Sequence, residues 1–244
     1  MVNCSVFAAI LCCCLSAACY AQGAATVLFS SGQARIVDRD GQVRAAPRGA
    51  QLAVGETVDT ADGRVQLRFR DGAQVSLHTA TRFRVDEFRF DEQNGRARPD
   101  DRGFFALLKG GFRTLSGLLG KERHEQYRVD AVVATIGIRG TDYAANLSDA
   151  GLAVSTFDGL VEVCSAAACA QVGPGQTVVV SDSSSVPRPQ SPAPGGVGAA
   201  PLVTDLLPQK PVELPPLTVP VQTPAPNVAP SVSPTYSPPT GPYR

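Results

Sequence analysis

The sequence predicts a mainly β protein: a solenoid-like or roll-like domain of antiparallel or mixed strands, followed by a disordered proline-rich tail. Between Ala24 and Asp182, short runs alternate apolar and polar residues with the two-residue period of half-buried strands. From residue 183 onward the composition changes, and 17 of the chain's 20 prolines lie between Pro187 and Pro242. We therefore expect a β domain over residues 24–182 and a polyproline-like or disordered tail over residues 183–244.

The first 21 residues resemble a secretory signal peptide. Val6 to Tyr20 is an uncharged apolar run that ends in small residues, and it is shorter than the roughly 20 residues that a membrane-spanning helix needs. Cleavage after Ala21 is favoured over lipidation of Cys19 and over an uncleaved anchor. We therefore expect a periplasmic or cell-envelope protein whose mature chain has no transmembrane helix.

The expected strands follow one another with glycine-containing turns between them. Asp-Gly pairs, which supply positive φ angles at tight turns, occur at residues 40–41, 62–63, 71–72 and 158–159. A weak echo between residues 53–60 and 172–180 is typical of stacked rungs. In chain order, the predicted strands cover residues 33–38, 64–70, 73–79, 82–88, 127–138, 141–147, 152–157, 160–164, 170–172 and 176–180.

One segment is a candidate helix. Residues 103–120 place Phe104, Leu107, Leu108 and Phe112 at helical spacing, but glycines at positions 110, 111 and 117 disfavour a long helix. We expect strands here, with one short helical turn.

Five of the seven cysteines lie in the leader, which leaves Cys164 and Cys169 in the mature chain. A pair of cysteines in an exported protein predicts a disulfide, here between two short strands at the end of a hairpin. A metal site would need two more ligands, and the two histidines, His78 and His124, are distant in sequence.

The composition disfavours several classes of function. The net charge is zero, which gives no reason to expect a nucleic-acid partner. The sequence has no nucleophile elbow, no zinc-protease motif and no phosphate-binding loop, so we expect neither an enzyme nor a cofactor.

A family resemblance rests on motifs that run in order through the β domain. They are "PRGAQLAVGETVDTADGRVQLRFRDGAQVSLHTATRFRVDEF", "GGFRTLSG", "YRVDAVVATIGIRGTDYAANL", "STFDGLVEVC" and "VGPGQTVVV". Together they resemble the FecR domain, the exported domain of ferric-citrate sensor regulators and of stand-alone relatives. The sharpest element is "VATIGIRGTDY". The sensors' cytoplasmic, membrane and receptor-docking segments are not visible in this sequence.

The resemblance implies a β-rich extracytoplasmic domain that is used for interaction and has no known catalytic residues. Its hallmark contains Gly137, Arg139, Gly140, Thr141 and Asp142. The glycines permit close backbone approach, and Arg139 can form a forked pair with Asp142, Asp130 or Asp158. We expect this arginine to be a structural clasp; the alternative is contact with a partner.

Two functions remain open. The first is a non-catalytic interaction module that binds a protein or a cell-envelope component, with signal sensing as one process it would serve. The second is a structural envelope protein that is tethered or spaced by its proline-rich tail.

Overall fold

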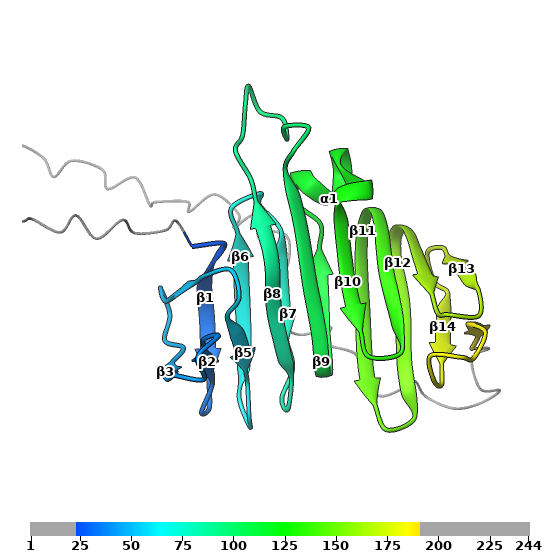
Figure 1. Cartoon of the computed structure of the whole chain (residues 1–244), viewed down its shortest axis with the longest axis horizontal. Helices are drawn as coiled ribbons and strands as arrows, with labels where there is room; N and C mark the ends of the chain where they lie inside the picture. The colour runs from blue at the N-terminus through cyan, green and yellow to red at the C-terminus, as the bar shows by residue number, and fades with distance from the viewer. Residues whose placement is uncertain (1–22, 191–244) are drawn as a thin grey trace, which may run out of the picture. The chain divides into compact units, whose positions relative to one another are not determined.

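The structure is a computed structural model that describes residues 23–190. The predicted mainly β domain is confirmed: fifteen strands form one hydrogen-bonded sheet, which does not close within these residues (Figure 1). The sheet is mixed, because β9 and β10 are parallel and every other pair of described strands is antiparallel. The predicted leader with Cys19, and the tail from residue 191 onward, lie outside the described residues.

The sheet folds into two layers that share three long strands. Layer A combines several short strands with the first halves of β9 and β11 and the second half of β12. In spatial order its strands are β3 (Val43–Ala45), β2 (Arg35–Val37), β5 (Thr57–Asp59), β8 (Arg82–Arg89), β9 (Arg102–Leu115), β10 (Tyr127–Ala131), β11 (Ala134–Ser148), β12 (Gly151–Cys164) and β13 (Cys169–Val172).

Layer B contains the remaining halves of the same three long strands. The second half of β9 pairs with β7 and β11, and the first half of β12 pairs with β14. Its other strands are β4 (Gln51–Leu52), β1 (Ala25–Ser31), β6 (Arg64–Phe69), β7 (Gln74–Leu77), β14 (Thr177–Val180) and β15 (Arg188–Pro189).

Each shared strand passes from one layer to the other at a glycine. Gly110 in β9, Gly140 in β11 and Gly159 in β12 have φ angles of +76°, +58° and +77°. Residues with a side chain rarely adopt these angles, so glycine makes the bends possible. The sequence interpretation of residues 158–159 as a turn between strands was wrong, because both lie inside β12.

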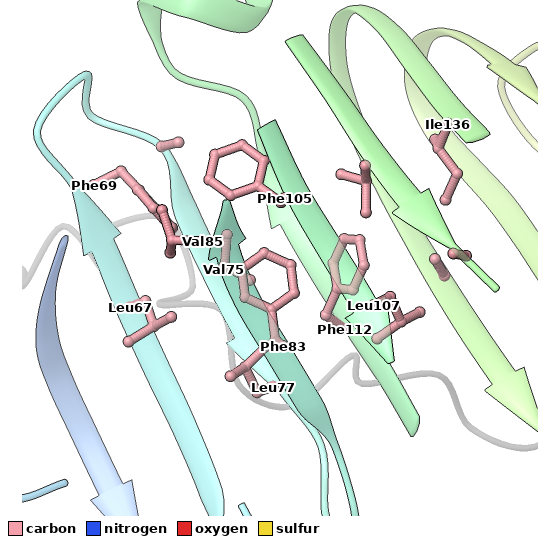
Figure 2. Close-up of a cluster of buried hydrophobic side chains, with 14 of the residues drawn as sticks. Leu67, Phe69, Val75, Leu77, Phe83, Val85, Phe105, Leu107, Phe112 and Ile136 are labelled. Carbon is pink, nitrogen blue, oxygen red and sulfur yellow. The ribbon is translucent and has the colours of Figure 1, made fainter. Parts of the chain in front are cut away.

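The core lies between the layers and is rich in aromatic rings. Strand alternation directs Phe69 of β6 toward Phe105 of β9, with ring centres 5.2 Å apart, and Phe83 of β8 toward Phe112, at 5.5 Å. Figure 2 shows these rings with aliphatic side chains such as Leu67 of β6, all pointing toward one another. Burial of this apolar surface is the main favourable term in folding.

The candidate helical segment forms strand β9 followed by helix α1 (Leu118–Glu122) and the 3₁₀ helix η1 (His124–Gln126). The expectation of β structure with one short helix is therefore confirmed, but the segment forms one continuous strand and not several. The Asp71 carboxylate accepts hydrogen bonds from the backbone N–H groups of Ala73 and Leu119, at 3.1 and 3.3 Å, and this fixes the start of α1. Burial raises the pKa of Asp71. No helix in residues 23–190 has the length and apolar character that crossing a membrane requires.

The predicted disulfide is confirmed. Cys164 and Cys169 are joined through sulfur atoms 2.08 Å apart and connect β12 to β13. The echo between residues 53–60 and 172–180 does not correspond to stacked rungs, since β5 pairs with β2 and β8 whereas β14 pairs with β12 and β15. Strand β15 lies beyond Asp182, where the sequence placed the end of the domain.

Candidate functional site

The hallmark segment is the bend of β11. The pairing of β11 with β12 shifts register between Arg139 and Asp142, where the strand leaves layer A and enters layer B. A Cβ atom on Gly159 would overlap the carbonyl oxygen of Gly140, so the two bends are packed backbone against backbone. Gly140 and Gly159 therefore have a structural role.

Hydrogen bonds to Thr141 hold the bend against the end of β9. Thr141 is 4% exposed, and its N–H donates to the Ser116 hydroxyl at 3.0 Å. The Thr141 carbonyl oxygen accepts the Ser116 N–H at 2.9 Å. This closed pair of bonds satisfies backbone groups that the shift in register would otherwise leave unpaired.

The carboxylate of Asp142 is bound by Arg113 of β9. Arg113 donates from Nε to Oδ1 at 2.9 Å and from Nη2 to Oδ2 at 2.7 Å, and the two side chains are only 13% and 16% exposed. This bond raises the pKa of Arg113. The guanidinium also lies 4.2 Å from the ring centre of Phe157, within the range of a cation–π contact.

The expected clasp by Arg139 is therefore wrong: the clasp exists, but Arg113 makes it. Arg139 precedes the bend and faces outward from layer A, whereas Asp142 follows the bend and belongs to the outer face of layer B. Among the described residues Arg139 makes no ion pair, and it is exposed. The other proposed acceptors do not pair with it either; Asp130 binds Arg128 at 3.0 Å and Asp158 makes no ion pair within residues 23–190.

Arg139 instead lines a groove on the outer face of layer A. The groove has a volume of about 140 Å³, and Gly137 forms part of its floor. A Cβ atom at Gly137 would meet nothing within 4 Å, and the φ angle of this residue is not positive. The fold therefore has no need of glycine at this position, although the lack of a side chain keeps the groove open.

The groove carries charges of both signs. Its lining is contributed by β11, β12, β13 and η1: His124, Glu125, Gly137, Ile138, Arg139, Leu160, Glu162 and Gln171. Neither Glu125 nor Glu162 makes an ion pair within residues 23–190. One guanidinium and two carboxylates are thus available to a partner. No group of three metal-binding side chains occurs in the described part of the chain.

A wider hollow of about 360 Å³ lies near the N-terminal end of layer A, but its charged groups already have partners within the domain or cover its wall. Asp38 accepts hydrogen bonds from the backbone N–H groups of Asp40 and Gln42. Arg84 and Asp86 form an ion pair there, and the Arg39 side chain lies against Gly55, where a Cβ atom would clash with it. We therefore favour the Gly137 groove as the candidate site.

Gly137 and Arg139, which the hallmark motif singled out, lie at this site, but the residues that complete it were not predicted. Glu125 comes from η1 and Gln171 from β13, and only the three-dimensional fold brings them beside β11. Arg113 was also missed as the partner of Asp142. A signal for it was present in "GGFRTLSG", where an arginine stands between Phe112 and Thr114 in a run that otherwise reads as a strand.

Comparison with known proteins gives one family. The family model described as "FecR protein" matches residues 56–162. No curated protein matches the chain. Two crystal structures of a candidate anti-sigma factor from Parabacteroides distasonis have similar folds over part of their length. The first has 16% identity and a TM-score of 0.43, with 55% of this chain and 58% of that chain covered. The second has 18% identity and a TM-score of 0.40, with 52% and 55% covered. This chain thus spans a little over half of each of those structures.

Proposed function

We propose, from the match of residues 56–162 to the FecR family model, that the protein is an exported, non-catalytic interaction module that binds a protein or a cell-envelope component. The binding surface is the groove around Gly137 and Arg139. One observation carries the proposal: Arg139 is exposed and unpaired among the described residues, while the neighbouring Asp142 is already bound by Arg113. Arg139 is therefore available to a partner.

An extracytoplasmic location is part of this proposal. The apolar leader over residues 1–21 supports export, and the bond between Cys164 and Cys169 supports an oxidising compartment. The periplasm or the cell envelope satisfies both. Sensing a signal in that compartment is the process that such a module would serve.

The test is capture of envelope components by the full mature chain, immobilised with its disulfide intact. Gly137→Val fills the groove and Arg139→Glu reverses its cation, so both variants should lose a component that the wild type retains. Arg64→Glu is the matched control, because Arg64 is exposed on β6, outside the groove. Equal melting temperatures would show that all four proteins are folded.

Two outcomes would contradict the proposal. Capture of the same components by wild type, Gly137→Val and Arg139→Glu would show that the groove is not the binding surface. Envelope retention that depends only on residues 191–244, with no component lost in either groove variant, would favour the structural envelope protein with a proline-rich tether.

A further inference from the structure

Strand β13 forms an open edge of layer A beside the groove. It pairs with β12 on one side, and none of the other described strands pairs with it (Figure 1). An edge strand can accept a further strand only if its outward backbone groups are free. Which residues of β13 direct their N–H and C=O groups away from β12 therefore decides whether this edge can accept a further strand.

In β13, the backbone N–H and C=O groups of Cys169 and Gln171 point away from β12. The Ser165 N–H donates to the Ala168 carbonyl oxygen at 2.9 Å, so Cys164 and Cys169 form the next, non-hydrogen-bonded pair of the ladder. Their Cα–Cα distance of 4.0 Å agrees with that type of pair. The alternation then directs the N–H and C=O groups of Cys169 and Gln171 away from β12. Both residues are exposed.

This edge is continuous with the groove. Gln171 pairs with Glu162 of β12, and both residues line the groove over Gly137. A strand added next to β13 would place every second side chain on this same outer face, one strand spacing of about 4.8 Å beyond Gln171. Its other side chains would face inward, beside the buried Val172.

Two further features favour a strand at this position. Proteins commonly protect an exposed edge by keeping the strand short or by adding charged residues, prolines or bulges. Strand β13 is short, at four residues, but its sequence Cys-Ala-Gln-Val contains no charged residue, no proline and no bulge. Layer B continues beyond β12 with β14 and β15, whereas layer A ends after β13 alone. The disulfide fixes β13 to β12, so the edge is ordered before any partner arrives.

We propose that β13 binds an extended segment of a partner protein, which adds to layer A as a further strand. This inference rests on the proposed function and specifies its partner. The segment alternates apolar residues, facing inward beside Ala170 and Val172, with a lysine or arginine on the outer face. The basic residue pairs with Glu162, which lies beside Gln171 on β12, whereas Arg139, on β11 and farther from this edge, binds an acidic group elsewhere on the same partner.

A second copy of this chain is a poorer occupant. Two strands of four residues bury far less than the roughly 1,000 Å² expected of a stable interface. Self-association would also offer Glu162 no lysine or arginine from β13, since β13 contains no charged residue.

The test uses a fluorescent seven-residue peptide in which valine and threonine alternate around a central lysine. It is added to the full mature protein with the disulfide intact. We expect saturable binding below about 1 mM, with slower hydrogen exchange at the Gln171 amide. A peptide N-methylated on its β13-facing amides, and one with glutamate in place of lysine, should each bind at least about tenfold more weakly.

Protein variants provide the matched controls. Gln171→Pro removes an outward N–H and should weaken binding of the lysine peptide at least about tenfold. Val43→Pro makes the same change on the exposed strand β3 at the opposite end of layer A, and it should leave binding unchanged. Equal binding of the methylated and unmethylated peptides, unchanged binding by Gln171→Pro, or no binding at about 1 mM would overturn the proposal.

The two proposals can fail separately. If Gln171→Pro still captures the envelope component that Gly137→Val and Arg139→Glu lose, the groove is the binding site but strand addition is wrong. If all of these variants behave as wild type in capture, the proposed function itself fails.

Discussion

A single bend separates two residues that are close in sequence. Arg139 and Asp142 are three positions apart, but a layer boundary lies between them, so their side chains belong to different faces of the domain. The sequence showed an arginine and an aspartate at pairing distance and predicted a clasp. It could not show that Gly140 bends the strand between them, because the bend depends on pairing with β9 and β12. The resulting assignments of Arg113 and Arg139 can be tested directly.

Arg113→Ala should destabilise the protein far more than Arg139→Ala. The first change leaves the Asp142 carboxylate, which is only 16% exposed, without its cation, and we expect a loss of about 2–4 kcal/mol. The second removes an exposed side chain and should change stability by less than about 0.5 kcal/mol. Urea unfolding of both variants measures the difference. Similar values for the two would contradict the assignment of the clasp to Arg113.

The two glycines Gly137 and Gly159 should respond in opposite ways to alanine. Gly159→Ala forces a side chain into a positive φ and against the Gly140 carbonyl oxygen, so we expect a loss of at least about 2 kcal/mol. Gly137→Ala meets open space and should be neutral or stabilising by up to about 1 kcal/mol. Thermal unfolding distinguishes the two. Destabilisation by Gly137→Ala would mean that the fold itself requires glycine there.

His78 should make the domain sensitive to mild acid. Its Nε2 atom is buried without a hydrogen-bond partner among the described residues, and burial, together with the nearby charge of Arg64, lowers its pKa. Below about pH 6.5 the unfolded chain therefore binds a proton at His78 more readily than the folded chain does. The free energy of unfolding consequently decreases as the pH is lowered. His78→Gln should lose less stability than the wild type between about pH 7 and pH 5. His124→Gln serves as the control, and an identical pH profile for His78→Gln and wild type would refute the prediction.

At the scale of elements, alternation predicted several half-buried strands well, but the single strand expected over residues 127–138 was wrong: it is β10 and the start of β11, joined by a turn at residues 132–133. Val65, Leu67 and Phe69 alternate with polar residues in β6, and the predicted strand over residues 64–70 agrees with the observed one. Strand β1, Ala25–Ser31, was missed because its apolar residues are consecutive and it follows directly on the predicted leader. The short strands β3, β4, β5 and β15 were missed as well, because two or three residues are too few to show a period.

The disulfide is the one covalent cross-link between side chains in the described part of the chain, and its effect on stability should be local. It closes a loop between cysteines five positions apart, for which chain entropy gives about 2 kcal/mol of stabilisation. Cys164→Ser combined with Cys169→Ser should lower the free energy of unfolding by about this amount and leave one cooperative transition. Thiol labelling of the unfolded, unreduced wild type should find no free thiol at these positions. Two reactive thiols would show that the bond does not form.

At the scale of the whole molecule, the mainly β class of the fold could be predicted from the sequence, but its division into two layers could not. Two layers arise because β9, β11 and β12 each bend at a glycine, and because the first half of β9 pairs in parallel with β10, an arrangement that no local pattern encodes. The groove has the same origin, since its walls come from β11, β12, β13 and η1. The hallmark motif contributes Gly137 and Arg139 to the groove, and long-range strand pairing brings the other lining residues beside them.

The end of the folded domain can be located by truncation. Strand β15 pairs with β14 through Val178 and Val179, and the Ser183 carbonyl oxygen accepts a hydrogen bond from Ala166 at 2.9 Å. A mature chain ending at Gln190 keeps these contacts, so we expect it to melt within a few degrees of the full mature chain. A chain ending at Asp182 loses them and exposes the edge of β14, which should lower the free energy of unfolding by about 1–3 kcal/mol. If both truncated chains melt alike, the folded domain ends near Asp182, as the composition alone predicts. If the chain ending at Gln190 is strongly destabilised, residues 191–244 contribute to the fold, and the tail is more than a tether.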